Sequence, residues 1–311
     1  MRMPQGVTRF DNVELMLVDP DVNVRDSLRS VLHHNGFRKL TAASSWFDIR
    51  NRLDGTPPDL LITEVDLLDG DVCALIRELR HQDVGTDPFL PIIALTREPT
   101  AESVKRVINS GADFLLGKPV SADQLTSRIR LLVDSRKPFV VTSNYIGPDR
   151  RKSTDRASNV PLVEVPNVLK ARIAGTQPQA NTLRKINLIA AQLNLMKLER
   201  LGFQIAYLVD RIAPVLEGGL PADAHAVDYL SQLVTVTEET VRRCIGTQVE
   251  HVGELCRSLL KVANSITNQK DAPVSRDVRL LQPLSNAIRR GLAEMGEAAE
   301  IARRISQEVN K

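Results

Sequence analysis

The chain has 311 residues, which is long enough for two domains with ordinary cores, and it carries a net charge of +3. With 42% hydrophobic and 25% charged residues the composition is globular, and no apolar run approaches the ~20 residues of a membrane span. The first residues lack the apolar stretch of a signal peptide, and the three scattered cysteines exclude a disulfide framework or zinc cluster, so we expect a cytoplasmic protein.

Short apolar runs alternate with amphipathic helical stretches from the N-terminus to about residue 134. The predicted strands are Val13–Val18, Lys39–Ala42, Asp59–Thr63, Pro91–Leu95 and Asp113–Leu116. The predicted helices are Asn23–His34, Ser45–Leu53, Val72–His81, Ala101–Ser110 and Ala122–Val133. This alternation predicts a doubly wound α/β domain over residues 11–135, with a five-stranded parallel sheet covered by helices on both faces. Its functional crevice should lie beyond the carboxyl ends of the strands.

Polar residues follow four of these strands in a specific order. Asp19 follows the first strand, Glu64 the third, Thr96 the fourth and Lys118 the fifth, in the strings LMLVDPDVNVR, PPDLLITEVDLLDGDV, PIIALT and GADFLLGKP. This order resembles the receiver domain of two-component response regulators. The resemblance implies that an acidic pair after the first strand binds Mg²⁺ and that an aspartate after the third strand accepts phosphate. It also implies that a Thr or Ser and a Lys contact the phosphoryl group.

The chain departs from that family pattern at three positions. Asp19 takes the place of the first acid, but Pro20 takes the place of the second and offers no side-chain oxygen to Mg²⁺. Asp21, one residue further along, completes a residual acidic pocket only if the loop turns it inward. Glu64 stands where the family has the phosphoacceptor aspartate, which makes the phosphorylation site degenerate. Leu115 stands where the family often has Tyr or Phe, so the aromatic part of the switch is lost.

The glutamate at position 64 leaves three interpretations open. Its carboxylate does not forbid an acyl phosphate, but the extra methylene moves the nucleophile by more than ~1 Å, and in-line transfer is sensitive to such a displacement. A Glu64–Lys118 salt bridge would instead imitate part of the phosphorylated state, and we favour this fixed, phosphate-independent conformation. The other two interpretations are residual phosphorylation at Glu64 or a nearby aspartate, and a scaffold without a switching role. Three following carboxylates are interpreted as solvated loop acids: Asp66, Asp69 and Asp71.

Residues 136–178 hold 8 basic against 3 acidic residues, whereas residues 1–135 hold 16 against 20. Five prolines and a mixed polar content predict a solvated linker over residues 136–178. One cluster in this linker is a candidate basic patch, which could meet nucleic acid, acidic lipid, a nucleotide or an acidic protein face. Its members are Arg150, Arg151, Lys152 and Arg156.

From about residue 179 the pattern changes to long amphipathic stretches. The predicted helices are Thr182–Leu216, Ala222–Asn268 and Val278–Val309. Apolar residues at seven-residue spacing form a seam along the second helix, cleanest from Val241 onward, with Gln248 inside it and Gly246 or Gly253 as a candidate bend. We therefore predict an all-α antiparallel bundle or coiled coil over residues 179–311, whose seam packs within one chain or pairs two chains.

These features predict an atypical response regulator with a pseudo-receiver, which is not an enzyme and acts as a phosphorylation-independent signalling adaptor through protein contacts of both domains. The alternatives are a phosphorylatable response regulator of a two-component phosphorelay and a DNA-binding regulator that uses the basic linker. We expect a signalling protein or kinase as partner, and a homodimer through the helical domain is possible. Nucleic acid contact is disfavoured because the helices are too long for a helix-turn-helix. No cofactor is expected. Mg²⁺ is expected only if the receiver can still be phosphorylated, and Asp19 would then hold it weakly.

Overall fold

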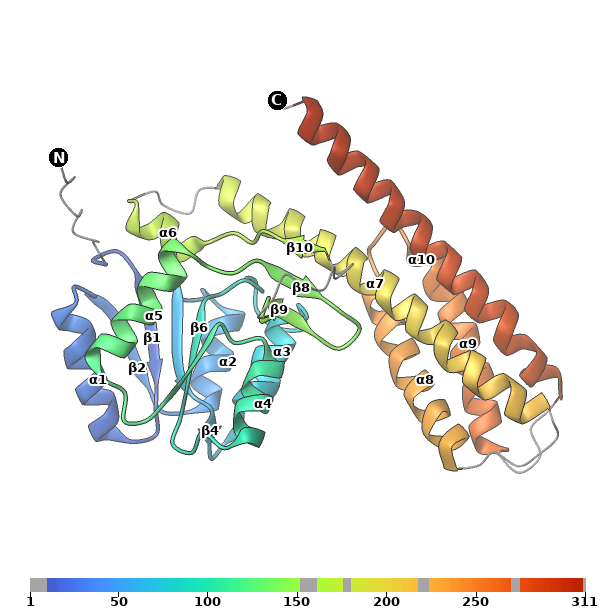
Figure 1. Cartoon of the computed structure of the whole chain (residues 1–311), viewed down its shortest axis with the longest axis horizontal. Coiled ribbons are helices and arrows are strands. Elements are labelled where there is room, and N and C mark those ends of the chain that lie inside the picture. The colour runs from blue at the N-terminus through green and yellow to red at the C-terminus, as the bar shows by residue number, and fades with distance from the viewer. Residues whose placement is uncertain (1–9, 152–160, 176–179, 218–223, 270–274, 310–311) are drawn as a thin grey trace. The chain divides into compact units, whose positions relative to one another are not determined.

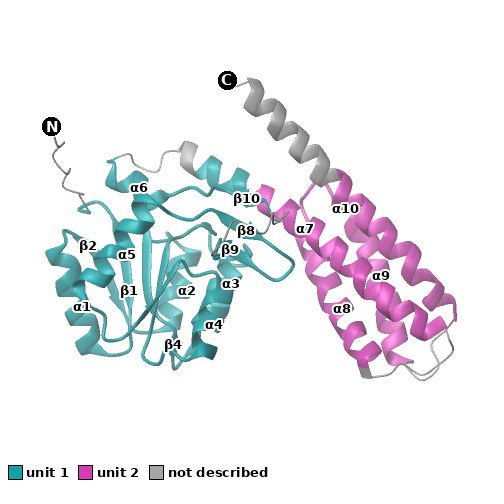
Figure 2. Ribbon diagram, viewed as in Figure 1, with its two compact units in different colours: residues 1–190 teal, residues 191–311 magenta. Residues whose placement is uncertain are grey.

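The computed structural model describes residues 10–151, 161–175, 180–217, 224–269 and 275–309. It divides the chain into two compact units, residues 1–190 and residues 191–311 (Figure 2). Among the described residues, no helix is both long enough and apolar enough to cross a membrane.

The first unit is built on a parallel sheet of five strands. The strands are β1 (Glu14–Val18), β2 (Lys39–Ala43), β3 (Leu60–Glu64), β6 (Ile92–Thr96) and β7 (Phe114–Gly117). Their order in the sheet is β2-β1-β3-β6-β7, and every pairing is parallel (Figure 1). Strands β3 and β6 are buried along their whole length, as expected for central strands covered on both faces. The predicted doubly wound parallel sheet is confirmed.

Five helices cover the two faces of this sheet. They are α1 (Val22–His34), α2 (Trp46–Asp54), α3 (Val72–Arg80), α4 (Ala101–Ser110) and α5 (Ala122–Asp134). Apolar residues of α1 and α5 pack in one core cluster, and those of α2, α3 and α4 pack in the other, on the opposite face. Between β3 and α3, the strands β4 (Asp66–Leu67) and β5 (Gly70–Asp71) form a very small hairpin. The sheet and helices thus place the carboxyl ends of β1, β3, β6 and β7 at one edge.

The segment after α5 differs from the predicted solvated linker, because much of it packs on the core of the α/β domain. Strands β8 (Phe139–Val141), β9 (Ile146–Pro148) and β10 (Leu162–Val163) form a small antiparallel sheet in the order β10-β8-β9, and α6 (Val168–Ile173) follows. Phe139, Val141 and Leu169 are fully buried. The strands are only two or three residues long, so their apolar spacing is too short to stand out among prolines and polar residues.

Two contacts fix this segment, whose described residues 136–151 and 161–173 are called the extension, to the rest of the α/β domain. Gly111, which ends α4 with a φ of +91°, lies so close to β9 that a Cβ atom there would be 2.7 Å from the Ile146 carbonyl oxygen. Arg172 of α6 forms an ion pair with Asp59 at 3.0 Å, just before β3. The first compact unit therefore includes residues that the sequence assigned to a linker.

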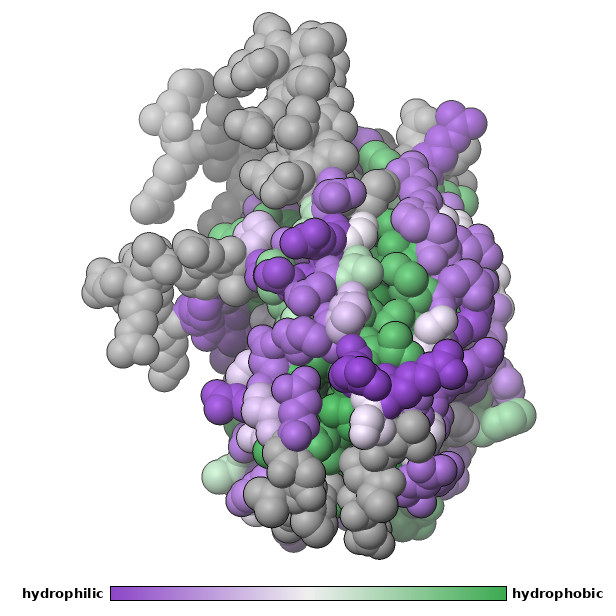
Figure 3. Space-filling view, turned by 90° about the vertical axis from the view of Figure 1, so that its right-hand side faces the viewer, coloured by the Kyte–Doolittle hydropathy of each residue, from purple (hydrophilic) through white to green (hydrophobic). Residues whose placement is uncertain are grey.

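The second unit is helical, as predicted. Its helices are α7 (Ala180–Glu217), which begins in the first unit, α8 (Ala224–Cys244), α9 (Glu250–Asn268) and α10 (Ser275–Val309). Helix α9 packs against both α8 and α10. All four helices contribute to one apolar core cluster, which includes Leu201, Leu233, Leu259 and Ile288. Figure 3 shows apolar side chains gathered in a stripe between ridges of hydrophilic side chains, the pattern of packed amphipathic helices.

The predicted helix over residues 222–268 is divided in two. Helix α8 ends at Cys244, Gly246 adopts a left-handed φ of +67°, and α9 begins at Glu250. Gln248 lies exposed in this turn and is not part of a buried seam. The seven-residue spacing therefore continues through a turn by coincidence, and the two halves of the predicted seam lie on two helices packed against each other.

Candidate functional site

The four residues that follow the strands meet at one edge of the sheet. Asp19, Glu64 and Thr96 are at most 1% exposed, and the side chain of Lys118 is 9% exposed. Strands β1, β3, β6 and β7 are parallel, so their carboxyl ends present these side chains to the same crevice. The structure thus brings together the four residues that the sequence predicted.

Lys118 is the centre of this cluster. Its Nζ atom forms ion pairs with Oδ2 of Asp19 and Oε2 of Glu64. The other carboxylate oxygen of Glu64, Oε1, accepts hydrogen bonds from the backbone amides of Val65 at 2.9 Å and Asp66 at 3.1 Å. The Glu64 carboxylate is therefore held by one cation and two amides, the kind of charge-assisted contacts that stabilise an anion.

Asp21 points away from the cluster. It is the N-cap of α1, where its carboxylate accepts a hydrogen bond from the Asn23 amide at 3.0 Å, and it forms an ion pair with Arg97 at 3.2 Å. Only its backbone amide faces the cluster, donating to Oδ1 of Asp19 at 3.0 Å. The predicted residual acidic pocket therefore contains Asp19 without the carboxylate of Asp21.

The donor set fits Mg²⁺ poorly. Mg²⁺ needs octahedral oxygen ligands, commonly including one or two carboxylates that are free to bind it. Here the carboxylates of Asp19 and Glu64 share the ammonium group of Lys118, Pro20 supplies no side-chain oxygen, and the Asp21 carboxylate is engaged elsewhere. We therefore derive no step that uses a metal ion at this crevice.

Thr96 contacts Asp66 instead of Glu64. Its hydroxyl lies 3.4 Å from Oδ2 of Asp66 and 3.4 Å from the Glu98 carbonyl oxygen, and Asp66 in turn forms an ion pair with Arg106 of α4. Asp66 was predicted to be a solvated loop acid, and half of its side chain is indeed exposed, but its ion pair links the crevice to α4. No local pattern could reveal this pair, because the two residues are 40 positions apart.

Leu115, which the sequence predicted to occupy the position of an aromatic switch residue, is half-buried on β7 and packs with the core of α2, α3 and α4. The adjacent Phe114 packs on the opposite face, where the Arg128 guanidinium lies 5.2 Å from its ring centre. The alternation expected along a strand is therefore observed. Without an aromatic ring at position 115, no hydroxyl or ring edge can move there with Thr96.

The candidate basic patch is only partly described. Arg150 is half-buried and donates a hydrogen bond to the Ala112 carbonyl oxygen, and Arg151 is exposed and forms an ion pair with Asp149 at 2.8 Å. Lys152 and Arg156 lie outside the described residues. The two described arginines therefore belong to the folded extension.

Comparison with known proteins gives one family. Residues 15–130 match the response regulator receiver domain. The chain is similar to response regulator MprA of Mycobacterium tuberculosis (strain H37Rv), 34% identical over 130 residues that cover 41% of this chain and 53% of the relative. It is also similar to MprA of Mycobacterium leprae, 34% identical over 129 residues that cover 40% and 53%. The chain thus spans about half the length of the curated relatives it matches.

Two solved structures are also similar to this region. One is the response regulator DrrB of Thermotoga maritima, with 24% identity, a TM-score of 0.36 and coverage of 42% of this chain and 56% of that one. The other is a CheY-like response regulator receiver domain protein from Methanospirillum hungatei JF-1, with 21% identity, a TM-score of 0.37 and coverage of 40% and 97%.

Proposed function

Residues 15–130 are a response regulator receiver domain, and from this premise we propose that the chain is a pseudo-receiver adaptor. In this proposal the chain is not an enzyme. It holds one receiver conformation without phosphoryl transfer and signals through protein contacts of its receiver and its helical unit. The partner would be a signalling protein or kinase.

The observation that carries the proposal is the position of Lys118 between two carboxylates. A receiver that accepts phosphate needs a free nucleophilic carboxylate and a metal ion beside it. Here the longer side chain of Glu64 reaches Lys118, and its second oxygen is held by two backbone amides. The Glu64 carboxylate is therefore paired with a cation and held in place. Its ion pair with Lys118 replaces the contact that a phosphoryl group would otherwise make with Lys118.

The test is intact-mass measurement after incubation with acetyl phosphate and Mg²⁺. We expect no added phosphoryl group on the wild-type chain and one on Glu64→Asp, because the shorter side chain withdraws from Lys118 and restores the geometry of the nucleophile. Glu64→Gln is the matched control, because its side-chain amide has no carboxylate that could accept a phosphoryl group. Phosphorylation of the wild-type chain would overturn the proposal.

The alternative is a phosphorylatable response regulator, and the match to the receiver family favours it. Thr96 and Lys118 occupy the expected positions, and Glu64 retains a carboxylate. This function would require Mg²⁺ on Asp19 together with Glu64, Asp21 or water. The wild-type arm of the same mass measurement distinguishes it from the adaptor.

Two further proposals concern the partners. We propose that the helical unit pairs two chains, so light scattering coupled to size-exclusion chromatography should give twice the mass of one chain. DNA contact through the basic patch remains the second alternative. It predicts salt-sensitive retention of DNA that is abolished by neutralising Arg150, Arg151 and Lys152, because each phosphate contact releases counterions.

A further inference from the structure

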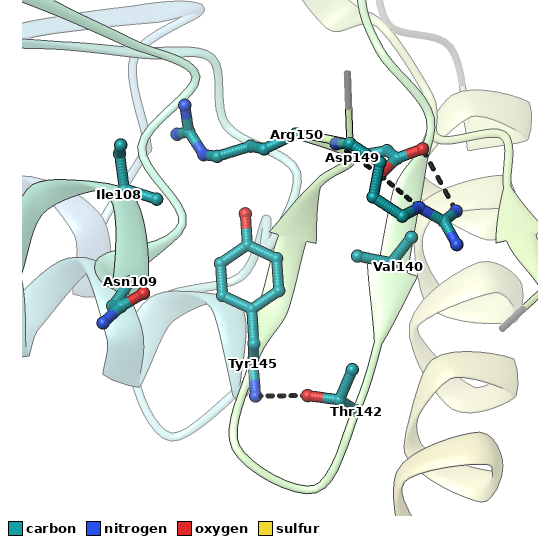
Figure 4. A pocket seen from close by; sticks show the side chains of 8 residues that line it. Ile108, Asn109, Val140, Thr142, Tyr145, Asp149 and Arg150 are labelled. Carbon is teal, nitrogen blue, oxygen red and sulfur yellow. Dashed lines mark hydrogen bonds and ion pairs between the residues drawn. The ribbon is translucent and has the colours of Figure 1, made fainter. Parts of the chain in front are cut away.

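The extension of the receiver carries a cavity that the proposed function does not use. The cavity measures about 400 Å³, within the range of small-molecule sites. Its wall is formed by the end of α4, at Ile108 and Asn109, and by β8 and the turn before β9, at Val140 and Tyr145 (Figure 4). Asp149, Arg150 and Arg151, which follow β9, complete it. All of these residues belong to the first compact unit.

The aromatic ring of Tyr145 lines this cavity. Its hydroxyl donates to the Pro148 carbonyl oxygen at 2.9 Å, and its backbone amide donates to the Thr142 hydroxyl at 3.1 Å, so both ends of the residue are held. Burial raises the pKa of the Tyr145 hydroxyl, although the nearby Arg150 guanidinium lowers it, so the ring stays neutral. Figure 4 shows the ring standing between the end of α4 and β8. A fixed, neutral ring in a cavity is a stacking surface for a planar group.

The arginines supply the positive charge. Figure 4 shows the Arg150 side chain passing the hydroxyl end of Tyr145. Its Nε atom is buried and has no hydrogen-bond partner of acceptable geometry among the described residues, although its terminal nitrogen donates to Ala112. Arg151 is held by Asp149, with Nε–Oδ1 and Nη2–Oδ2 distances of 2.8 and 3.1 Å. The guanidinium also interacts with the Tyr145 hydroxyl, and Nε remains as a further charged donor that is suited to a phosphate or carboxylate oxygen.

We propose that this cavity binds a nucleoside monophosphate, with the base stacked on Tyr145 and the phosphate bound by Arg150. The nearness of a stacking ring to a guanidinium selects a ligand that joins a planar group to an anion. The cavity volume suits one nucleotide and not a polymer. Asp149 weakens binding, because its carboxylate lies on the same wall and neutralises Arg151.

The cavity and the crevice share helix α4. Ile108 and Asn109 line the cavity, and Arg106, on the same helix, forms the ion pair with Asp66 beside Thr96. A ligand packed against the end of α4 thus contacts the same helix that the Arg106–Asp66 ion pair connects to the crevice. If the receiver works without phosphate, as proposed above, this nucleotide is its input, and this coupling step rests on that proposed function.

The test is isothermal titration of the full chain with AMP, GMP, CMP and UMP at low salt, with adenosine and inorganic phosphate as control ligands. We expect saturable binding of at least one mononucleotide and much weaker binding of both controls, since each lacks half of the ligand. Tyr145→Leu should weaken binding roughly tenfold because it removes stacking, while Tyr145→Phe should not. Arg150→Gln should weaken binding roughly tenfold or more because it removes a charge-assisted hydrogen bond.

Asp149→Asn should change the affinity in the opposite direction. A gain in affinity cannot result from misfolding, so this variant tests the site independently of the other variants. It frees Arg151 and removes a negative charge, so binding should tighten by about twofold or more. Absence of saturable heat with all four mononucleotides, or equal binding of inorganic phosphate, would overturn the site. Unaltered affinity in Arg150→Gln and Asp149→Asn would overturn it as well.

The coupling is read separately by amide hydrogen exchange of α4. Binding of the mononucleotide should slow exchange within residues 101–110, and the effect should be lost in Arg150→Gln. Unchanged exchange at a saturating concentration would overturn the coupling. Phosphorylation of the wild-type chain by acetyl phosphate would overturn the proposed function and leave the titration result standing, so the two failures are distinguishable.

Discussion

Arg136, which follows α5, forms an ion pair with Asp113, which precedes β7, with Nε and Oδ1 3.0 Å apart and both side chains about 5% exposed. Oδ2 of Asp113 also accepts hydrogen bonds from Arg80 at 3.1 Å and from the Ile92 amide at 2.9 Å. Burial lowers the pKa of Arg80 to about 10, so the guanidinium stays charged at neutral pH. One buried carboxylate thus joins α3, β6, β7 and the extension, and this makes the extension part of the receiver core.

A chain that ends at residue 135 should therefore be much less stable than one that ends at residue 190. It loses Arg136 and a set of buried apolar side chains that includes Phe139, Val141, Ile146 and Leu169. Each contributes about 1.5–3 kcal/mol when fully buried, so we expect a loss on the order of 5 kcal/mol or more. Trp46 is the single tryptophan and lies in this unit, so urea unfolding followed by its fluorescence reports on the receiver. Equal free energies of unfolding would contradict this prediction.

Lys118→Met should destabilise the receiver by about 3–5 kcal/mol, because it leaves the buried carboxylates of Asp19 and Glu64 without their cation. Glu64→Gln is the matched control and should cost less, since Lys118 keeps Asp19 as a partner. Both variants are compared with the wild-type chain by urea unfolding followed by Trp46 fluorescence. A Lys118→Met variant as stable as the wild type would show that the ion pairs contribute little.

Asp87→Asn should stabilise the receiver at pH 7. Burial raises the pKa of Asp87, although Arg136 and Arg80 lower it, so folding favours the protonated form over the charged one. The stability that this carboxyl contributes is therefore full below its unfolded pKa of about 3.9 and is lost as the pH rises through the folded pKa. Asparagine keeps an oxygen for the Phe89 amide, which donates to Oδ1 of Asp87 at 2.9 Å, and it removes the charge.

The free energies of unfolding of Asp87→Asn and the wild-type chain should be compared at several pH values. The advantage of the variant should shrink as the pH falls and the wild-type carboxyl becomes protonated. A variant that is less stable at pH 7 would mean that attraction from Arg80 and Arg136 outweighs the cost of burial.

Gly246→Ala should destabilise the helical unit by about 1 kcal/mol, because an L-residue is strained at the φ of +67° that turns the chain between α8 and α9. Ile245→Ala is the control. Ile245 lies in the same turn and is 60% exposed, so its loss should change stability little. Thermal unfolding followed by far-ultraviolet circular dichroism measures the change, while Trp46 fluorescence should remain as in the wild type. Equal effects of the two substitutions would argue against strain at Gly246.

The amino-acid pattern was sufficient to predict the receiver fold and the residues of its crevice. Alternation of apolar runs with amphipathic stretches is a local pattern, and parallel strands bring their carboxyl ends to one edge, so Asp19, Glu64, Thr96 and Lys118 could be grouped without coordinates. The salt bridge between Glu64 and Lys118 was also expected, because the extra methylene extends the carboxylate toward the lysine.

Only the tertiary structure decided which carboxylates belong to the crevice and where each domain ends. Asp21 is directed away by its role as the cap of α1, and Asp66 is tied to Arg106 of α4, forty residues away. The short strands β8 and β9 are held by residues far away in the chain, since Phe139 packs against Phe89 and Ile146 lies beside Gly111, and their own sequence is too short to predict them. Likewise the seven-residue spacing persists through the turn at Gly246. The contacts of Asp66 and of the short strands join residues far apart in the chain, and a local pattern carries no information about them.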